Sequence, residues 1–408
     1  MHRYLLAMTL VCPLGALLGA VHPLDAEGAA SLAKSKNPEL VAARSLVAEA
    51  QARAYSSGRL SNPEVEVEVA GGQDFEGRVS VGLTQRFPLT ARLRFERELS
   101  GLEVEAAKLE VRNRERQIAV AARTAFYELA AARESLGLAR SQTELADSFA
   151  KSLAAGVTEG FGSNADAQQA ALATDVLRMT EDSLRVAELQ AAANLSGILG
   201  LPLDDALTLR DSLELPRTAP PVRPMGVRPD LELAELAVRA GTADVSLAKA
   251  ARWDDFGVGI FVAGERFRDE PDGIEPEALV GVRFSTALPF WQNGSGKVRE
   301  KKASQERKTQ QLEALRLTVR NEIRAAHRVM TANFRAAAFA RDKIVPASRQ
   351  QASDVEAAYR RGEVDIQNVF RARDRLGELE FSALEAKKTF LISYAEWLGA
   401  LGDPVARP

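Results

Sequence analysis

An internal repeat constrains the fold of this chain more than any other feature of its sequence. The segment NPEL at 37–40 and the segment RPDL at 228–231 each open an alanine-rich helical stretch, and the two openings are 191 residues apart. The same succession of patterns follows both of them. We therefore expect two pseudo-repeats, 23–200 and 228–402, each with the order helix, β-hairpin, long helix and returning helix.

Four segments alternate apolar residues with polar or small ones, which is typical of β-strands that have two different faces. In the first repeat these segments are 64–69 and 78–87, and in the second they are 255–262 and 280–288. A polar, turn-rich stretch separates the two segments of each pair. The pattern predicts one β-hairpin in each repeat.

A very long helical segment follows each hairpin. Residues 91–155 contain no proline, and residues 297–361 contain only Pro346. At the rise of an α-helix, ~65 residues span roughly 100 Å. Each repeat is therefore expected to contain a helix far longer than those of ordinary globular domains.

A short turn ends each long helix, and a shorter helix returns from it. Gly160 and Gly362 suit the left-handed position that closes a helix C-terminus. Ser163 and Asp365 suit the N-cap of the returning helix, and Asp166 follows Ser163 at the spacing of a capping box. We expect these residues to form the tip of each repeat.

The two ends and the middle of the chain lie outside the repeats. Residues 1–22 are predicted to be a secretory signal peptide, because Arg3 precedes an apolar run that small residues follow. The alternative is an uncleaved membrane anchor, since the run approaches spanning length. The proline-rich segment 201–227 is expected to be a linker or irregular collar and not a core element, and 403–408 a C-terminal tail.

Composition argues against several functional classes. The chain carries 53 Lys+Arg and 56 Asp+Glu, so it lacks the basic excess of a nucleic-acid binder. Its one cysteine, Cys12, lies in the first apolar run, and it has three histidines, which are too few for a zinc or soft-metal site. The sequence NGSGK at 293–297 lacks the first glycine of a phosphate-binding loop. No catalytic, cofactor or metal site is therefore expected, and the chain is not expected to be an enzyme.

The alternating segments have the length and pattern of tilted outer-membrane strands. A half-buried sheet in a soluble protein alternates in the same way, but export and the long helices favour the membrane. Four strands are too few to close a barrel, and open edges are not tolerated in lipid, so several chains must contribute strands. The polar side chains would then face a shared aqueous lumen: Glu64, Glu66, Glu68, Arg78, Arg86 and Arg283.

Together these features resemble the outer-membrane efflux (TolC-like) family of trimeric channel-tunnels. The resemblance rests on the two openings, on the hairpins that end in FPL at 87–89 and LPF at 288–290, and on tip turns followed by Ala170 and Ala372. It implies a mainly α fold with a small β part. As a homotrimer, such a protein would form an α-helical barrel in the periplasm, a twelve-stranded β-barrel in the outer membrane and a mixed collar.

The resemblance also implies a function and partners. The chain would be a passive exit duct of a tripartite efflux system, working with a periplasmic adaptor (membrane fusion) protein and an inner-membrane pump of the RND type. Residues 288–297 look most like members paired with heavy-metal cation pumps, so metal cations or small toxic compounds are the expected cargo. Two alternatives stay open: the outer-membrane component of a type I protein secretion system, and a periplasmic coiled-coil scaffold or adaptor.

The tip departs from the pattern of the family. Members often narrow the periplasmic end with aspartates just after the tip turns. Asp166 matches such a position in the first repeat, whereas Asn368 and Arg371 stand where aspartates are expected in the second. This departure argues against a cation-selective ring of aspartates, and a plain helix-capping role is the alternative for Asp166.

Overall fold

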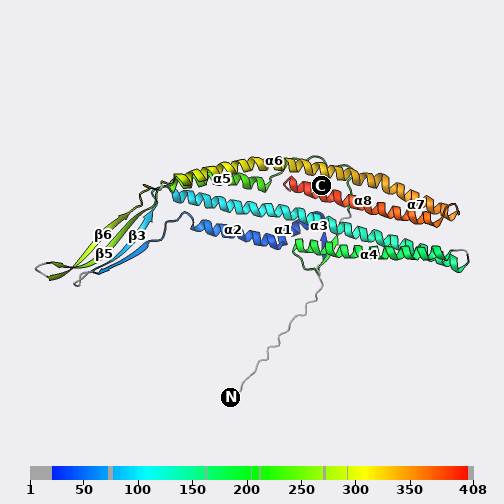
Figure 1. Cartoon of the computed structure of the whole chain (residues 1–408), viewed down its shortest axis with the longest axis horizontal. Helices are drawn as coiled ribbons and strands as arrows, with labels where there is room; N and C mark the ends of the chain where they lie inside the picture. The colour runs from blue at the N-terminus through cyan, green and yellow to red at the C-terminus, as the bar shows by residue number, and fades with distance from the viewer. Residues whose placement is uncertain are drawn as a thin grey trace, which may run out of the picture. The chain divides into compact units, whose positions relative to one another are not determined.

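The computed structural model describes residues 21–71, 77–160, 163–203, 205–210, 213–269, 273–291 and 293–402. The chain divides into two compact units, and Figure 1 shows their helices and strands. One unit contains residues up to Pro38 together with 117–222 and 326–399, and the other contains 39–116, 223–325 and the residues from Ala400 onward. Each unit thus combines residues from before and after the proline-rich segment.

The second of these units contains the larger sheet. Its strands are β2 (Glu64–Gly71), β3 (Gly77–Phe87), β5 (Phe256–Asp269) and β6 (Gly273–Ser285), all antiparallel in the order β2-β3-β5-β6. Both hairpins expected from the alternation are confirmed. The structure adds the pairing of β3 with β5, which joins the two hairpins into one sheet.

Helices complete this unit. They are α2 (Pro38–Ser56), α5 (Pro229–Ala250), the first part of α3 (Arg92–Thr158) and the first part of α6 (Ser295–Phe339). Leu102 of α3 packs with Leu236 and Ala243 of α5 in a buried cluster. Alanine and glycine let these helices approach closely: a Cβ on Gly241 of α5 would lie 3.3 Å from the Lys308 side chain of α6.

The first unit is built mainly from helices. It contains α1 (Ala26–Lys36), the rest of α3, α4 (Asn164–Leu199), the end of α6, α7 (Val345–Arg360) and α8 (Ile366–Ala400). The predicted long helix of the first repeat is confirmed, since α3 has 67 residues. Large side chains fill the core of this unit: Phe126, Leu129, Leu195, Leu199, Met330, Phe390 and Trp397.

The long helix of the second repeat is not continuous. A π-helical turn, η1 (Ala340–Ile344), separates α6 from α7, and Pro346 lies in the first turn of α7. Proline has no N–H to donate and its ring collides with the preceding helical turn, so an extra residue in the ladder relieves the conflict. The sequence showed the break at Pro346 but not its form.

The proline-rich segment corrects one expectation. Within 201–227, where no core element was expected, β4 (Ala206–Leu209) pairs in parallel with β1 (Val21–Leu24). Leu207 and Leu213 of this segment are buried. The sequence did not predict this pairing, because the first two residues of β1, Val21 and His22, belong to the segment predicted to be a signal peptide. Residues 1–20 and the tail at 403–408 lie outside the described residues.

Candidate functional site

The predicted lumen residues lie on one face of the larger sheet, which we call the polar face. Strand residues alternate between faces, and the side-chain contacts agree with this assignment. Arg86 donates to both carboxylate oxygens of Glu64, from Nε at 2.9 Å and from Nη2 at 3.1 Å. Glu68 accepts a bond of 3.5 Å from Ser80, which lies directly opposite it.

Two further ion pairs cross the polar face. Arg78 lies opposite Glu265 in the register, and the two side chains approach to 2.8 Å. Arg283 of β6 contacts Glu66 of β2, which is the opposite edge of the sheet. The structure therefore brings all six predicted residues together and adds Glu265.

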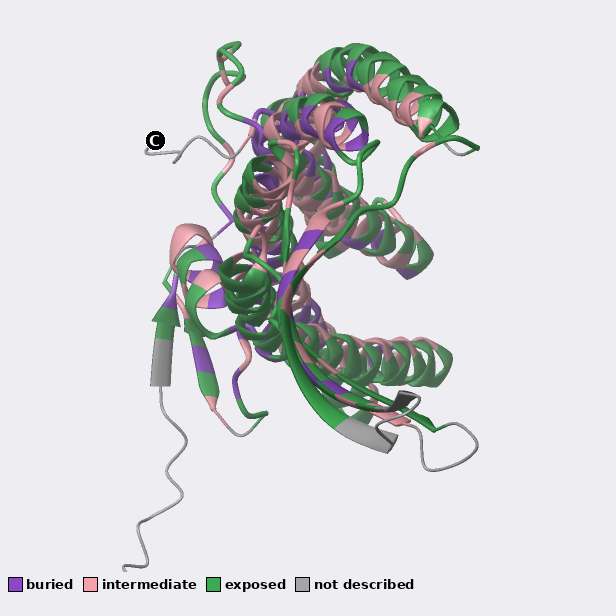
Figure 2. Ribbon diagram, turned by 90° about the vertical axis from the view of Figure 1, so that its left-hand side faces the viewer, coloured by how far each residue is buried: buried purple, intermediate pink, exposed green. Residues whose placement is uncertain are grey.

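The opposite face of the sheet is apolar and exposed, and we call it the apolar face. Most of the surface of the strands is coloured as exposed in Figure 2. Eleven large apolar side chains of this face are 47–78% exposed in the single chain. They are Val65, Val67, Val69, Val79, Val81, Leu83, Ile260, Val262, Val280, Val282 and Phe284. A continuous apolar surface of this kind indicates contact with lipid or with another protein.

Phe261 is an aromatic residue on the polar face, and the sequence pattern did not predict it there. Its ring lies over Gly281, where an added Cβ would come within 2.5 Å of the ring. The Arg283 guanidinium lies 5.5 Å from the ring centroid, within the range of a cation–π contact. The signal was present in the sequence, because Ile260, Phe261 and Val262 break the strict alternation.

A cavity of about 510 Å³ lies at the end of the strands. Arg92 of α3 contributes to its lining and donates bonds of 2.6 Å to Asp255 and to Glu96. Burial lowers the pKa of the Arg92 guanidinium, but the hydrogen bonds and charges of these two carboxylates outweigh it, so the pKa lies above its ordinary value. Arg92 is therefore a fixed positive charge at this end of the sheet.

The tip residues of the first repeat adopt the predicted caps. Gly160 has a φ of 82°, in the left-handed region that favours glycine. Ser163 is the N-cap of α4, and its Oγ accepts a bond of 3.4 Å from the backbone N–H of Asp166. This is the bond expected of a Ser N-cap, so Asp166 occupies the third helical position.

The tip of the second repeat is similar. Gly362 has a φ of 75°, and Asp365 directly precedes α8, where its carbonyl accepts a bond from the backbone N–H of Asn368. Arg371 donates to the side chain of Asn368 and to the carbonyl of Gln367, both at 3.3 Å. Both of these contacts of Arg371 lie within its own helix.

Two contacts near the tips were not expected from the sequence. The side-chain amides of Gln169 in α4 and Gln367 in α8 bond reciprocally, at 3.1 and 2.6 Å. The ring of Phe149 lies between Tyr359 and Phe370, and the guanidinium of Arg373 lies 4.6 Å from its centroid. Contacts between segments that are far apart in the sequence produce no pattern in the residues around them.

Within the described residues there is neither a membrane-crossing helix nor a cluster of metal ligands. None of the helices that the structure describes is both long enough and apolar enough to cross a lipid bilayer. No group of three or more His, Cys, Asp or Glu side chains in the same part of the chain is arranged to hold a metal ion.

Comparison with known proteins places the fold. No protein-family model and no curated protein matches the sequence. Several solved structures do match. CusC has a TM-score of 0.74 and 16% identity, over 92% of each chain. The open state of the MtrE outer membrane channel of Neisseria gonorrhoeae has a TM-score of 0.74 and 15% identity, over 92% of this chain and 88% of that one. The outer membrane protein VceC of Vibrio cholerae has a TM-score of 0.72 and 16% identity, over 92% and 96%. The chain therefore has the fold of these outer-membrane channels, as the resemblance in its sequence predicted.

Proposed function

We propose that this protein is a passive exit duct in the outer membrane, formed by three copies of the chain. The observation that carries the proposal is the larger sheet. One of its faces is apolar and exposed, and the other is lined by charged side chains that pair with one another. A sheet with lipid on one side and water on the other has this distribution.

The four strands of each chain support assembly from three chains. Strands β3, β5 and β6 have 11, 14 and 13 residues, enough to cross a bilayer when tilted. In the single chain, the edges β2 and β6 each have only one partner strand. Because unpaired backbone groups are not tolerated in lipid, the edges must be joined to those of other chains. Three chains supply the twelve strands expected of the barrel.

The helices support the same assembly. The element order α2-β2-β3-α3-α4 is followed by α5-β5-β6-α6-α7-α8, as two pseudo-repeats require. On α4 the apolar side chains Leu172, Val176, Met179 and Val186 are exposed, at spacings of three, four and seven. This spacing gives one apolar stripe along a helix. Packing of such stripes between copies would build the periplasmic α-helical barrel.

The partners and the cargo follow from the same proposal. A passive duct supplies no energy for export. We therefore include an inner-membrane pump of the RND type, which would drive the cargo, and a periplasmic adaptor, which would connect the pump to the duct. The cargo is proposed to be metal cations or small toxic compounds, from the similarity of residues 288–297 to members that serve heavy-metal pumps. Binding of the cargo is not required of a duct.

The decisive experiment separates the duct from a scaffold or adaptor. We expect the full chain in outer-membrane fractions as a heat-modifiable trimer that resists SDS, and we expect long-lived conducting steps when it is reconstituted in planar bilayers. A stable folded monomer, or recovery only in the soluble periplasmic fraction, would contradict the proposal. The cargo would be tested separately, by deleting the gene and measuring resistance to metal salts and to organic toxicants.

A further inference from the structure

The ion pair between Glu66 and Arg283 joins strands that are not neighbours. Glu66 lies on β2 and Arg283 on β6, the two edges of the sheet, with β3 and β5 between them. Each residue faces a glycine on the adjacent inner strand, Glu66 opposite Gly82 and Arg283 opposite Gly259. The two side chains therefore extend over inner strands that offer them no side chain at those positions.

The other two arginines of the polar face have partners on neighbouring strands. Arg86 binds Glu64 across β3 and β2, and Arg78 binds Glu265 across β3 and β5. Cross-strand pairs of this kind are the usual unit of sheet stabilisation. Among these three pairs, Glu66 and Arg283 alone connect strands with no backbone pairing between them.

The two edges differ in charge. On its polar face, β2 presents the acidic row Glu64, Glu66 and Glu68. On the polar face of β6, Arg283 is the charged residue between Leu279 and Ser285, and Glu277 lies nearer the hairpin turn, opposite Glu265. Joining β2 to a second β2 would place acidic rows side by side, which is unfavourable. Joining β2 of one copy to β6 of the next is complementary, and it closes a ring.

Distance also favours a partner in the next copy. Neighbouring strands lie about 4.8 Å apart, so the two edges of one chain are separated by about 14 Å along the sheet. In a closed barrel, β2 of the next copy would lie only one spacing from β6. A pair across one spacing would need much less extension of the two side chains than the present pair, which spans three spacings.

From this geometry we propose that Arg283 exchanges partners on assembly. It leaves Glu66 of its own chain and pairs with Glu66 of the adjacent copy, so that this ion pair marks the seam between chains and sets the register there. The inference rests on the proposed trimeric duct and adds the residues that join its strands.

Disulfide cross-linking tests the exchange directly. The natural cysteine is first removed by Cys12→Ser, and Glu66→Cys and Arg283→Cys are combined in the full chain. After oxidation of outer membranes, we expect covalent dimers and trimers on a denaturing gel. The matched control is Glu68→Cys with Ser80→Cys, two residues directly opposite each other, which should give only a link within one chain. A link confined to one chain for the 66–283 pair, or no link, would overturn the exchange.

Charge reversal gives a second test that needs no cysteine. Glu66→Arg and Arg283→Glu should each lower the yield of SDS-resistant trimer about tenfold, because three equal seams change together. The double variant should recover most of the trimer, and Glu68→Arg, which reverses a charge of the same row without removing the ion pair, should lower the yield much less than Glu66→Arg. A double variant no better than the single ones would also overturn the inference. If the parent chain itself forms no trimer, the proposed function and the seam are both overturned, whereas failure of the double variant beside a stable parent trimer overturns the seam alone.

Discussion

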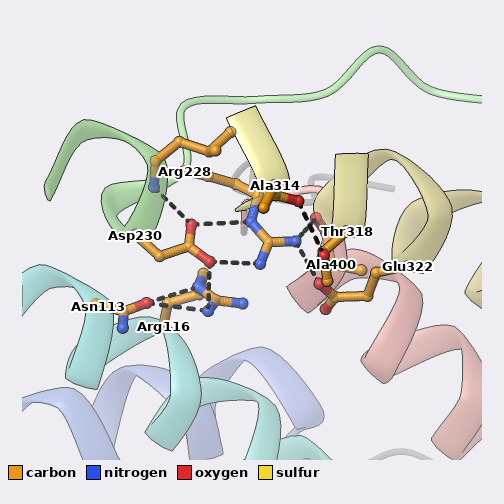
Figure 3. A network of polar contacts seen from close by, with 9 residues as sticks. Asn113, Arg116, Arg228, Asp230, Ala314, Thr318, Glu322 and Ala400 are labelled. Atoms are coloured by element: carbon orange, nitrogen blue, oxygen red, sulfur yellow. Dashed lines mark hydrogen bonds and ion pairs between the residues drawn. The ribbon is translucent and has the colours of Figure 1, made fainter. Parts of the chain in front are cut away.

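The guanidinium of Arg228 donates a hydrogen bond of 2.8 Å to the carbonyl oxygen of Ala400, the last residue of α8. Figure 3 shows this side chain between Asp230, Glu322 and Ala400. In the other unit, the Asn37 amide donates a bond of 2.8 Å to the carbonyl of Ile198, near the end of α4. The residue before the proline in each opening motif thus holds the C-terminal end of a returning helix.

A left-handed glycine completes each of these contacts. Gly200 has a φ of 67°, and a Cβ there would lie 2.5 Å from the carbonyl of Lys36. Gly402 has a φ of 99°, and a Cβ there would lie 2.8 Å from the carbonyl of Val227. Only glycine fits these positions, both for its conformation and for the close approach of the chain. The opening motifs NPEL and RPDL therefore stabilise the fold, and this role does not depend on transport.

Replacing Arg228 should destabilise the protein strongly. Its side chain is 3% exposed, so Arg228→Ala opens a gap in the packing and leaves the half-buried carboxylate of Asp230 and the carbonyl of buried Ala400 without their main partner. We expect a loss of about 3 kcal/mol in the free energy of unfolding. Asn37→Ala should cost about 1 kcal/mol, the value of one neutral hydrogen bond.

Urea unfolding of the purified protein, followed by its helical circular dichroism, measures both losses. The control is Arg112→Ala, which removes an arginine that is 64% exposed and whose guanidinium makes a weak contact of 3.9 Å with its carboxylate partner. An equal loss for Arg112→Ala and Arg228→Ala would show that burial of the Arg228 network contributes nothing.

Stability should fall in acid through Asp230. Burial raises the pKa of its carboxyl, but the hydrogen bond from Arg228 and the charges of Arg228 and Arg116 outweigh it, so the pKa lies below its ordinary value. A depressed pKa contributes stability above the unfolded value of about 3.9, and this stability is lost as the pH falls through the folded value. Unfolding free energies at about pH 5 and about pH 3 should therefore differ less in Asp230→Asn and in Arg228→Met than in the parent chain. An unchanged difference in both variants would contradict this assignment.

The local patterns of the sequence predicted much of the fold. The alternation of Val65, Val67 and Val69 with glutamates gave the strands and their two faces, because strand periodicity is a short-range property. The glycines of the tips marked both turns for the same reason. The pairing of β1 with β4, the pairing of β3 with β5 and the bond between Gln169 and Gln367 all join distant segments. No local pattern encodes such contacts, so the sequence did not show them.

A charge on the apolar face should prevent insertion. Val67 is 65% exposed on that face, and arginine at the midplane of a membrane strand costs ~2–4 kcal/mol in each chain. Val67→Arg should therefore abolish the SDS-resistant trimer in outer-membrane fractions. Glu68→Arg introduces the same side chain at the adjacent residue, on the polar face, and should assemble. Equal tolerance of the two variants would mean that the faces are assigned wrongly or that the sheet does not meet lipid.

The last prediction concerns the tips of the two repeats. Asp166 lies in the first turn of α4 and Arg371 in the second turn of α8. Asp166 is half-buried and Arg371 is exposed in the single chain. In the proposed trimer, both would stand near the periplasmic entrance, where they could meet across neighbouring chains. Such a contact would bias the entrance toward its closed state.

Breaking this contact should open the entrance. Asp166→Ala or Arg371→Ala should raise the open probability in planar bilayers by up to about fivefold for each pair broken, which is the upper value expected of an exposed ion pair. The double variant should add little to either single one, because the same contact is lost. Asp166→Glu keeps the charge and should behave like the parent chain. If Asp166 only caps α4, Asp166→Ala should lower the stability of the tip and Arg371→Ala should leave the open probability unchanged.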